Sequence, residues 1–341
     1  MPTLDLSQGL SVVIPFYNEG SNTPKSAEFV LAALMRTTFP SEVIVVNDGS
    51  SDGISRDSFP KSVRYFEKNH TGRFETRYFG LNSSKYQNVL FIDARVWIGV
   101  DSLKNLEELI SSYPESRYWN GYIKSADTHL ATVSIWETLV SVGWGAGIHL
   151  TDTIHFGQED FDRFPKGTTL FLATKSDWLA AFQNMGQSDS KLSPVSDDTK
   201  ILRYLVKSGD IWIDNKFSAE YQPRTTLSKF LKNAFYRGKT FVDSYWESPT
   251  IFGKLVKASI PLGIVLQILF YTYGDFLSLI VGDFSLLLTV SLIFFGYSHK
   301  KWRNKNRAAK ESIILIPLIL SFGSGFLLAY LFGLTNRLRR K

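Results

Sequence analysis

The chain contains no cysteine. A protein without cysteine can form neither a disulfide framework nor a thiolate metal site. Histidine is also scarce, and the five histidines are scattered rather than grouped at metal-ligand spacing. The first residues lack the basic stretch and apolar core of a secretory signal peptide. We therefore expect the N-terminal part of the chain to lie in the cytoplasm.

Acidic residues are too few to balance the basic ones, and the formal net charge is +6. The excess is concentrated in two basic blocks, residues 299–310 and 337–341, which lie beside apolar stretches. Basic blocks in such positions are typical of contacts with a membrane surface. We therefore expect membrane lipids, and no nucleic acid, to be the partners of these charges.

Long apolar stretches are missing before residue 250 and dominate the sequence from about Ala258 onward. Three stretches are expected to form hydrophobic helices, at Ala258–Tyr273, Phe276–Tyr297 and Ser312–Leu334. The first is short for a membrane span, whereas the other two are long enough. The sequence therefore predicts a multi-pass protein of the plasma membrane with two to three hydrophobic helices.

The third apolar stretch raises a question of topology. If the first two stretches form a hairpin, the positive-inside rule places residues 299–310 in the cytoplasm. A third complete span would then place residues 337–341 outside, against the rule. Pro317 and the glycines of residues 323–325 make this stretch a candidate for a break. Asp283, within the second stretch, is expected to face protein, water or a headgroup rather than lipid.

The first two hundred residues alternate between strand-like and helix-like segments. Short apolar runs at Leu10–Phe16, Glu42–Ser50, Val63–Lys68 and Asn88–Asp93 predict strands, and Pro24–Thr37 predicts a helix. Continuous apolar strands separated by helices indicate a mostly parallel sheet that is covered on both faces. The predicted fold class is therefore α/β.

Polar residues follow several of the predicted strands. Glu19, Asp48 and Asp93 all stand at or just after such strand ends. In open α/β sheets, ligands bind in the crevice at the carboxyl ends of the strands. These positions therefore predict a binding crevice, and the alternative is that they are ordinary turn residues.

Two segments follow the predicted sheet. Asp197 and Asp198 stand at the start of an expected helix. Thr225–Trp246 places apolar residues on one helical stripe with lysine and arginine around it. Such a helix either lies in the membrane interface or packs on the folded domain.

The motifs VVIPFYNE, VIVVNDGSSDG, FIDAR and SDDTKILRYL, in this order, resemble those of the family 2 glycosyltransferases of the GT-A fold. The resemblance covers roughly residues 10–240, and YQPRTTLSKFLKNAFYRG resembles membrane-anchored, exopolysaccharide-type members (succinoglycan glucosyltransferase-like). It implies a Rossmann-like, mostly parallel sheet with flanking helices, followed by C-terminal transmembrane helices. The expected domains are 1–224 (GT-A), 225–257 (amphipathic helices) and 258–341 (membrane).

The resemblance implies an inverting transfer of sugar from a nucleotide sugar, expected to be linked to UDP, to a lipid-linked saccharide such as a polyprenyl-linked one. The chemistry needs nucleoside contacts, charge for the diphosphate and a carboxylate that accepts a proton. Arg77 stands where the family has an arginine that faces the diphosphate, and its alternative is a solvated helix charge. The resemblance assigns the nucleoside to Pro15, Tyr17, Glu19 and Asp48, and the tight turn beside it to Gly49.

Asp93 resembles the first acid of the family's Asp-x-Asp motif, which touches ribose or metal. Arg95 stands where the second acid usually stands, and here the sequence departs from the pattern. Asp93 could still hold Mg²⁺ or Mn²⁺ together with phosphate oxygens. Alternatively, the charge of Arg95 could replace part of the metal's role, or Arg95 could simply pair with Asp93.

Asp198 resembles the catalytic base of the family, with Asp197 as second choice. The alternative is a helix N-cap beside an acid that the helix dipole favours. Arg224 and Arg237 are expected near the acceptor or the membrane.

Two other functions remain open. One is transfer of a sugar directly to polyprenyl phosphate, and the other is a catalytically inactive scaffold that binds a sugar nucleotide. The sequence predicts no oligomeric state.

Overall fold

The computed structural model describes residues 3–144, 152–186, 197–246, 248, 251–273 and 276–338. These residues fall into two compact units. Of the described residues, the sheet unit comprises 3–126, 144, 152–186 and 197–223, and the helical unit comprises 127–143, 224–246, 248, 251–273 and 276–338.

The sheet unit is built around an eight-stranded sheet of order β3-β2-β1-β4-β9-β6-β10-β8. The first four strands in this order are mutually parallel, whereas β9 runs antiparallel to both of its neighbours, and β8 runs antiparallel to β10. The strands are β1 (Leu10–Phe16), β2 (Ser41–Asn47), β3 (Val63–Glu67), β4 (Asn88–Ile92), β6 (Tyr118–Asn120), β8 (Ile154–Phe156), β9 (Leu170–Thr174) and β10 (Ile211–Ile213).

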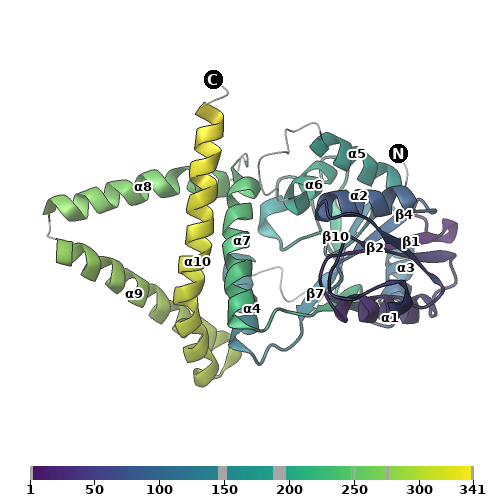
Figure 1. Ribbon diagram of the computed structural model, residues 1–341, viewed down its shortest axis with the longest axis horizontal. Helices are drawn as coiled ribbons and strands as arrows, with labels where there is room; N and C mark the ends of the chain where they lie inside the picture. Colours follow the sequence, from purple (N-terminus) through teal and green to yellow (C-terminus); the bar gives the residue numbers. More distant parts are fainter. Residues whose placement is uncertain are drawn as a thin grey trace. The chain divides into compact units, whose positions relative to one another are not determined.

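Helices cover both faces of this sheet, as Figure 1 shows. Successive side chains of a strand point to opposite faces, so Val12 packs in one apolar core and Val13 in the other. The core that contains Val12 is closed by α1 (Asn22–Leu34) and α3 (Ser102–Ser112). The core that contains Val13 is closed by α2 (Arg73–Ser83), α5 (Lys175–Gly186) and α6 (Asp197–Leu205).

A second, three-stranded sheet lies in the same unit and has the order β5-β11-β7. β11 (Ser218–Tyr221) is antiparallel to β5 (Val96–Ile98) and parallel to β7 (Tyr122–Ser125). This second sheet brings the residues that follow β11 beside the segment between β4 and β5. There Gln222 N donates to Arg95 O at 2.7 Å. Short 3₁₀ helices occupy Leu6–Gln8, Arg56–Ser58 and Phe161–Arg163.

The helical unit contains α7 (Leu227–Tyr245), α8 (Ile251–Tyr273), α9 (Phe276–Trp302) and α10 (Lys305–Leu338). It also contains α4 (Ala131–Trp144) except for the last residue of that helix. Residues 127–143, which lie inside the first domain expected from the sequence, belong to this unit. The reason is the apolar side of α4, where Ile135 is buried with Phe230 of α7 and Leu315 of α10.

Two glycines let α7 and α10 pack closely. A Cβ on Gly238 would meet Phe322 O at 2.0 Å, and a Cβ on Gly325 would meet Phe235 O at 2.0 Å. Small residues allow such backbone approach between helices. Within the Thr225–Trp246 segment, α7 (Leu227–Tyr245) is therefore a helix that packs on α10 of its own unit.

A buried carboxylate holds α4 to α9 and α10. Glu311 of α10 is fully buried. Its oxygens accept hydrogen bonds from Ser134 and Thr138 of α4 and from Ser298 of α9, the last at 2.7 Å. Arg307 Nε lies 3.9 Å from Glu311 Oε1. Both carboxylate oxygens of this acid therefore accept hydrogen bonds from protein donors.

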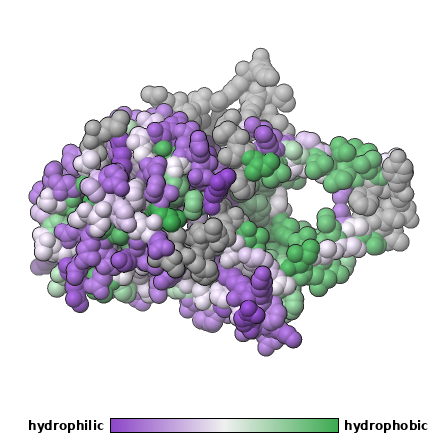
Figure 2. All heavy atoms as spheres, turned by 180° about the vertical axis from the view of Figure 1, so that it is seen from behind, coloured by the Kyte–Doolittle hydropathy of each residue, from purple (hydrophilic) through white to green (hydrophobic). Residues whose placement is uncertain are grey.

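Two helical segments are long and apolar enough to cross a membrane, Val281–Trp302 and Lys305–Gly333. Figure 2 shows apolar side chains gathered on the surface of the helical unit. The suggested break in the third apolar stretch is wrong, because α10 continues through Pro317, and Gly325 serves close packing instead. Asp283 of α9 is exposed and accepts a hydrogen bond from Gln267 Nε2 of α8 at 2.9 Å, so it contacts protein, one of its three expected surroundings.

Candidate active site

The parallel strands bring the predicted polar residues to one edge of the sheet. β1, β2 and β4 are adjacent and point the same way. Glu19, Asp48 and Asp93 follow these strands, so they share that edge. Pro15 lies in β1 opposite Val46, beyond the last residue that pairs with β4, where its missing N–H breaks no ladder bond to that strand.

Asp48 holds the loop between β3 and α2. Its side chain is 2% exposed. Oδ1 accepts from Lys68 Nζ at 2.6 Å and from Thr71 N at 3.0 Å, while Oδ2 accepts from Gly72 N at 2.9 Å. Burial alone would raise the pKa of Asp48, but the hydrogen bonds from Lys68 and the loop amides lower it below its usual value. The carboxylate is therefore ionised and fixed.

Gly49 is required at the turn that follows Asp48. Its φ is +73°, and a Cβ there would lie 2.9 Å from His70 N. The turn therefore brings the segment after β3 against the end of β2. There the ring of Tyr17, which is half exposed, stacks on the ring of His70 with centroids 4.0 Å apart.

Arg77 of α2 joins two carboxylates. Its Nη2 donates to Asp93 Oδ1 and its Nη1 to Asp198 Oδ1, each at 2.8 Å. The Arg77 side chain is 4% exposed, whereas those of Asp93 and Asp198 are 33% and 27% exposed. Arg77 is therefore no solvated helix charge. One buried guanidinium, whose planar fork suits two acceptors, fixes two accessible carboxylates from distant parts of the chain.

Thr168 completes the surroundings of Asp198. Its side chain is fully buried, and Oγ1 donates to Asp198 Oδ1 at 2.6 Å. Burial raises the pKa of Asp198, but the charges of Arg77 and Arg73, with the hydrogen bonds from Thr168 and Arg77, lower it to about 2. Asp198 is therefore ionised at neutral pH.

Arg95 turns away from Asp93. Its Nε donates to Glu19 Oε2, and its Nη1 donates to Gln222 O at 3.0 Å. The hypothesis that Arg95 simply pairs with Asp93 is wrong. Val96 N donates to Asp93 O at 2.9 Å, and this tight turn after β4 sends residues 93 and 95 to different neighbours.

The remaining expected residues lie in two places. Asp197 is the first residue of α6. Arg224 and Arg237 belong to the helical unit, and the Arg237 guanidinium lies 4.4 Å above the ring centre of Trp136.

Three residues at this edge were not predicted from the sequence: Lys68, His70 and Thr168. The first two follow β3, a strand that the sequence predicts, so attention to all strand ends could have found them. Thr168 precedes β9, which runs antiparallel beside β4 and which the sequence analysis did not predict. Nothing near Thr168 in the sequence indicates that it would meet Asp198.

The donor set for a divalent cation is small. Among the described residues, no group of three or more histidine, aspartate or glutamate side chains could hold a metal ion. Mg²⁺ commonly binds through one or two carboxylates together with substrate phosphates and water. Asp93, whose Oδ1 is bound by Arg77 and whose side chain is one-third exposed, fits such a cation only in combination with a diphosphate.

Comparison with known proteins finds similarity in the N-terminal part. The model of the family described as glycosyl transferase family 2 matches residues 11–132. An uncharacterized glycosyltransferase of Rickettsia bellii (strain RML369-C) is 36% identical over 89 residues, which make up 25% of this chain and 12% of that protein. Residues 11–132 are thus similar to family 2 glycosyltransferases, and the matched stretch spans a small part of the length of this relative.

One solved structure supports the fold. The mannosyltransferase PcManGT from Pyrobaculum calidifontis, in complex with GDP-Man and Mn²⁺, has a TM-score of 0.51 at 12% identity, over 92% of this chain and 86% of its own. TarS of S. aureus has a TM-score of 0.44 at 14% identity, over 78% of this chain and 44% of its own. The first likeness confirms the predicted α/β fold of GT-A type.

Proposed function

We propose that this chain is a membrane-bound, inverting glycosyltransferase that moves a sugar from a nucleotide sugar, a UDP-sugar, to a lipid-linked saccharide. The observation that carries the proposal is the pair of accessible carboxylates, Asp93 and Asp198, held by the buried Arg77. The match of residues 11–132 to glycosyl transferase family 2 supports it.

In the proposed reaction, the acceptor hydroxyl attacks the anomeric carbon while the bond from that carbon to the diphosphate oxygen breaks. The bonding electrons leave with the diphosphate, and the hydroxyl proton passes to a carboxylate oxygen of Asp198. One in-line displacement inverts the anomeric centre. Asp198 suits this role because it is ionised and partly exposed.

Arg77 is a positioning residue in this proposal. Because it is buried and binds both carboxylates, it sets the spacing between the donor side at Asp93 and the base. A carboxylate that is held in place lowers the activation barrier more than a mobile carboxylate does. Arg77 also keeps Asp198 ionised before the acceptor arrives.

The strand ends would hold the nucleoside. Tyr17 offers an exposed ring, and Glu19 is fixed by Arg95. Asp48 and Gly49 shape the turn beside them. We assign the base and ribose to this edge, with Pro15 setting the direction of the chain that leaves β1.

A Mg²⁺ or Mn²⁺ ion, when bound, would be held by Asp93 and the donor phosphates, and it would offset the charge of the leaving diphosphate. Arg77 donates a hydrogen bond to the same carboxylate. Its positive charge therefore limits the negative charge that Asp93 alone presents to the ion. Arg95 forms a salt bridge with Glu19, so we assign Arg95 a role in shaping the site.

Membrane attachment belongs to the same proposal. The two apolar segments that are long enough to cross a membrane support it. We place the sheet unit on the cytoplasmic side of a multi-pass plasma-membrane protein, with Arg224 and Arg237 near the acceptor or the lipid surface.

Calorimetry with purified full-length protein tests the donor site. We expect UDP to bind more tightly than GDP, and binding to weaken when Mn²⁺ is replaced by chelator. The variant Asp93→Asn should lose the metal effect. Absence of binding by either nucleotide, in a protein whose thermal unfolding is normal, would remove the transferase proposal.

A further inference from the structure

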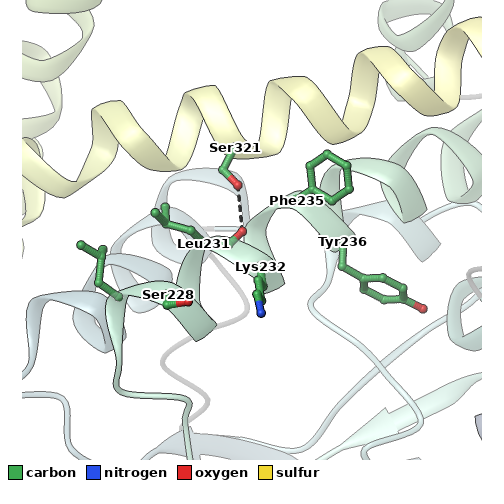
Figure 3. Close-up of a pocket in the computed structure, with 7 residues that line it drawn as sticks. Ser228, Leu231, Lys232, Phe235, Tyr236 and Ser321 are labelled. Carbon is green, nitrogen blue, oxygen red and sulfur yellow. Dashed lines mark hydrogen bonds between the residues drawn. The ribbon is translucent and has the colours of Figure 1, made fainter.

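The helical unit carries an open groove between α7 and α10, with a volume of about 780 Å³. This volume lies in the range of about 300–1,000 Å³ that is usual for ligand sites. Figure 3 shows side chains of α7 lining the groove below α10. Leu227, Leu231 and Phe235 supply its apolar surface, Ser321 comes from α10, and Lys232 and Tyr236 stand at its rim.

The interior of the groove is unsuited to polar ligands. The hydroxyl of Ser321 is already used, because it donates to Leu231 O at 2.8 Å, a bond drawn in Figure 3. Leu227 is 52% exposed along the groove. Apolar surface of this kind is stabilised by contact with hydrocarbon rather than water.

The rim of the groove is basic. Lys232 points away from α10 in Figure 3, and Lys229, three residues earlier, lies on the same side of α7. Both lysines are exposed. In the part of the chain that the structure describes, neither lysine forms a salt bridge with an acidic side chain.

We propose that this groove binds an anionic phospholipid, with one acyl chain against Leu231 and Phe235 and its phosphate beside Lys229 and Lys232. An apolar trough that ends at two uncompensated cations matches a molecule with one hydrocarbon end and one acidic end. A second copy of the chain would place like charges together, so it fits less well. The proposal does not depend on glycosyl transfer.

The absence of cysteine makes a clean test possible. The full-length variant Ser228→Cys, labelled with bimane in the groove, is reconstituted into phosphatidylcholine vesicles. Doxyl-labelled phosphatidylglycerol or doxyl-labelled phosphatidylcholine is then added as quencher. We expect the acidic lipid to quench more strongly, and the double change Lys229→Gln/Lys232→Gln to reduce its apparent affinity by about fivefold for each lysine.

The matched control removes two lysines from another helix of the same unit. Lys254→Gln/Lys257→Gln on α8 has the same spacing and both positions are exposed, and we expect it to keep the preference for acidic lipid. Equal quenching by both lipids, or a preference that survives the loss of Lys229 and Lys232, would overturn the proposal. Absence of quenching by either lipid, with protection that grows with protein concentration, would assign the groove to a second copy.

Discussion

The two units bury charge in different ways. In the sheet unit the cation Arg77 is buried, and its partners Asp93 and Asp198 stay about one-third exposed. In the helical unit the acid Glu311 is itself fully buried, and hydroxyl donors surround it. Burying a charge costs free energy unless the charge is paired, and in both units the buried charge has partners. Only the first leaves carboxylate oxygens that a ligand can reach.

The comparison separates a reactive site from a structural one. Asp198 has protein donors on Oδ1, from Arg77 and Thr168, and a partly exposed side chain. Glu311 has hydroxyl donors from two other helices, α4 and α9, and no exposed surface. Removing the first acid should therefore affect chemistry, and removing the second should affect folding.

The largest expected effect comes from Asp198→Asn. The amide cannot take the acceptor proton, so turnover should fall by roughly 10²–10⁴-fold. Because the side chains are of equal size, donor affinity should change little. Steady-state rates and nucleotide calorimetry on the same preparation check both expectations. A large loss of donor affinity with unchanged turnover would reverse the proposed assignment.

Glu311→Leu should lower the free energy of unfolding by about 3–5 kcal/mol, because Arg307 and three hydroxyl groups lose their acceptor. Denaturant unfolding in detergent measures this loss. The exposed Glu108→Leu is the control, since its pair with Lys104, at 3.9 Å on the surface of α3, contributes less than about 1 kcal/mol. Turnover of the remaining folded Glu311 variant should be unchanged.

Arg77→Gln should shift the pH dependence of activity. The Arg77 charge lowers the pKa of Asp198, so its loss raises that pKa towards or above the ordinary value of about 3.9. An acid limb in kcat/KM should therefore move to higher pH. An unchanged profile, in a variant that still folds by circular dichroism, would separate Arg77 from the base.

Thr168→Val should give the smallest effect. It removes one hydrogen bond to the ionised Asp198, worth about 1.5 kcal/mol, so kcat should fall by roughly tenfold and the acid limb should shift in the same direction as for Arg77→Gln. Thr168→Ser, which keeps the hydroxyl, should restore both. A Ser variant no better than the Val variant would show that packing, rather than the hydrogen bond, matters at this position.

The strands that were predicted from the sequence are those that consist of continuous apolar runs. β1 begins and ends at the expected residues, Leu10 and Phe16, because local β-branched runs define such strands. β9 was not predicted, since its position is set by pairing with β4 and β6 rather than by a local pattern. Thr168 was missed for the same reason.

Side-chain partners were harder to predict than positions. The sequence places Asp93 and Arg95 side by side, yet the turn after β4 gives Asp93 to Arg77 and Arg95 to Glu19. Spacing along the chain cannot show which of several nearby cations an acid will meet. The placement of α4 with α9 and α10 likewise depends on Glu311, far away in sequence.

The central claim is that Asp198 accepts the proton in transfer from a nucleotide sugar. The most direct measurement follows nucleoside diphosphate release from UDP-sugars by the wild-type protein and by Asp198→Asn, in the presence of a membrane lipid extract and with donor binding measured in parallel. We expect release by the wild type only, with donor bound equally by both. Equal release by both proteins would contradict the account.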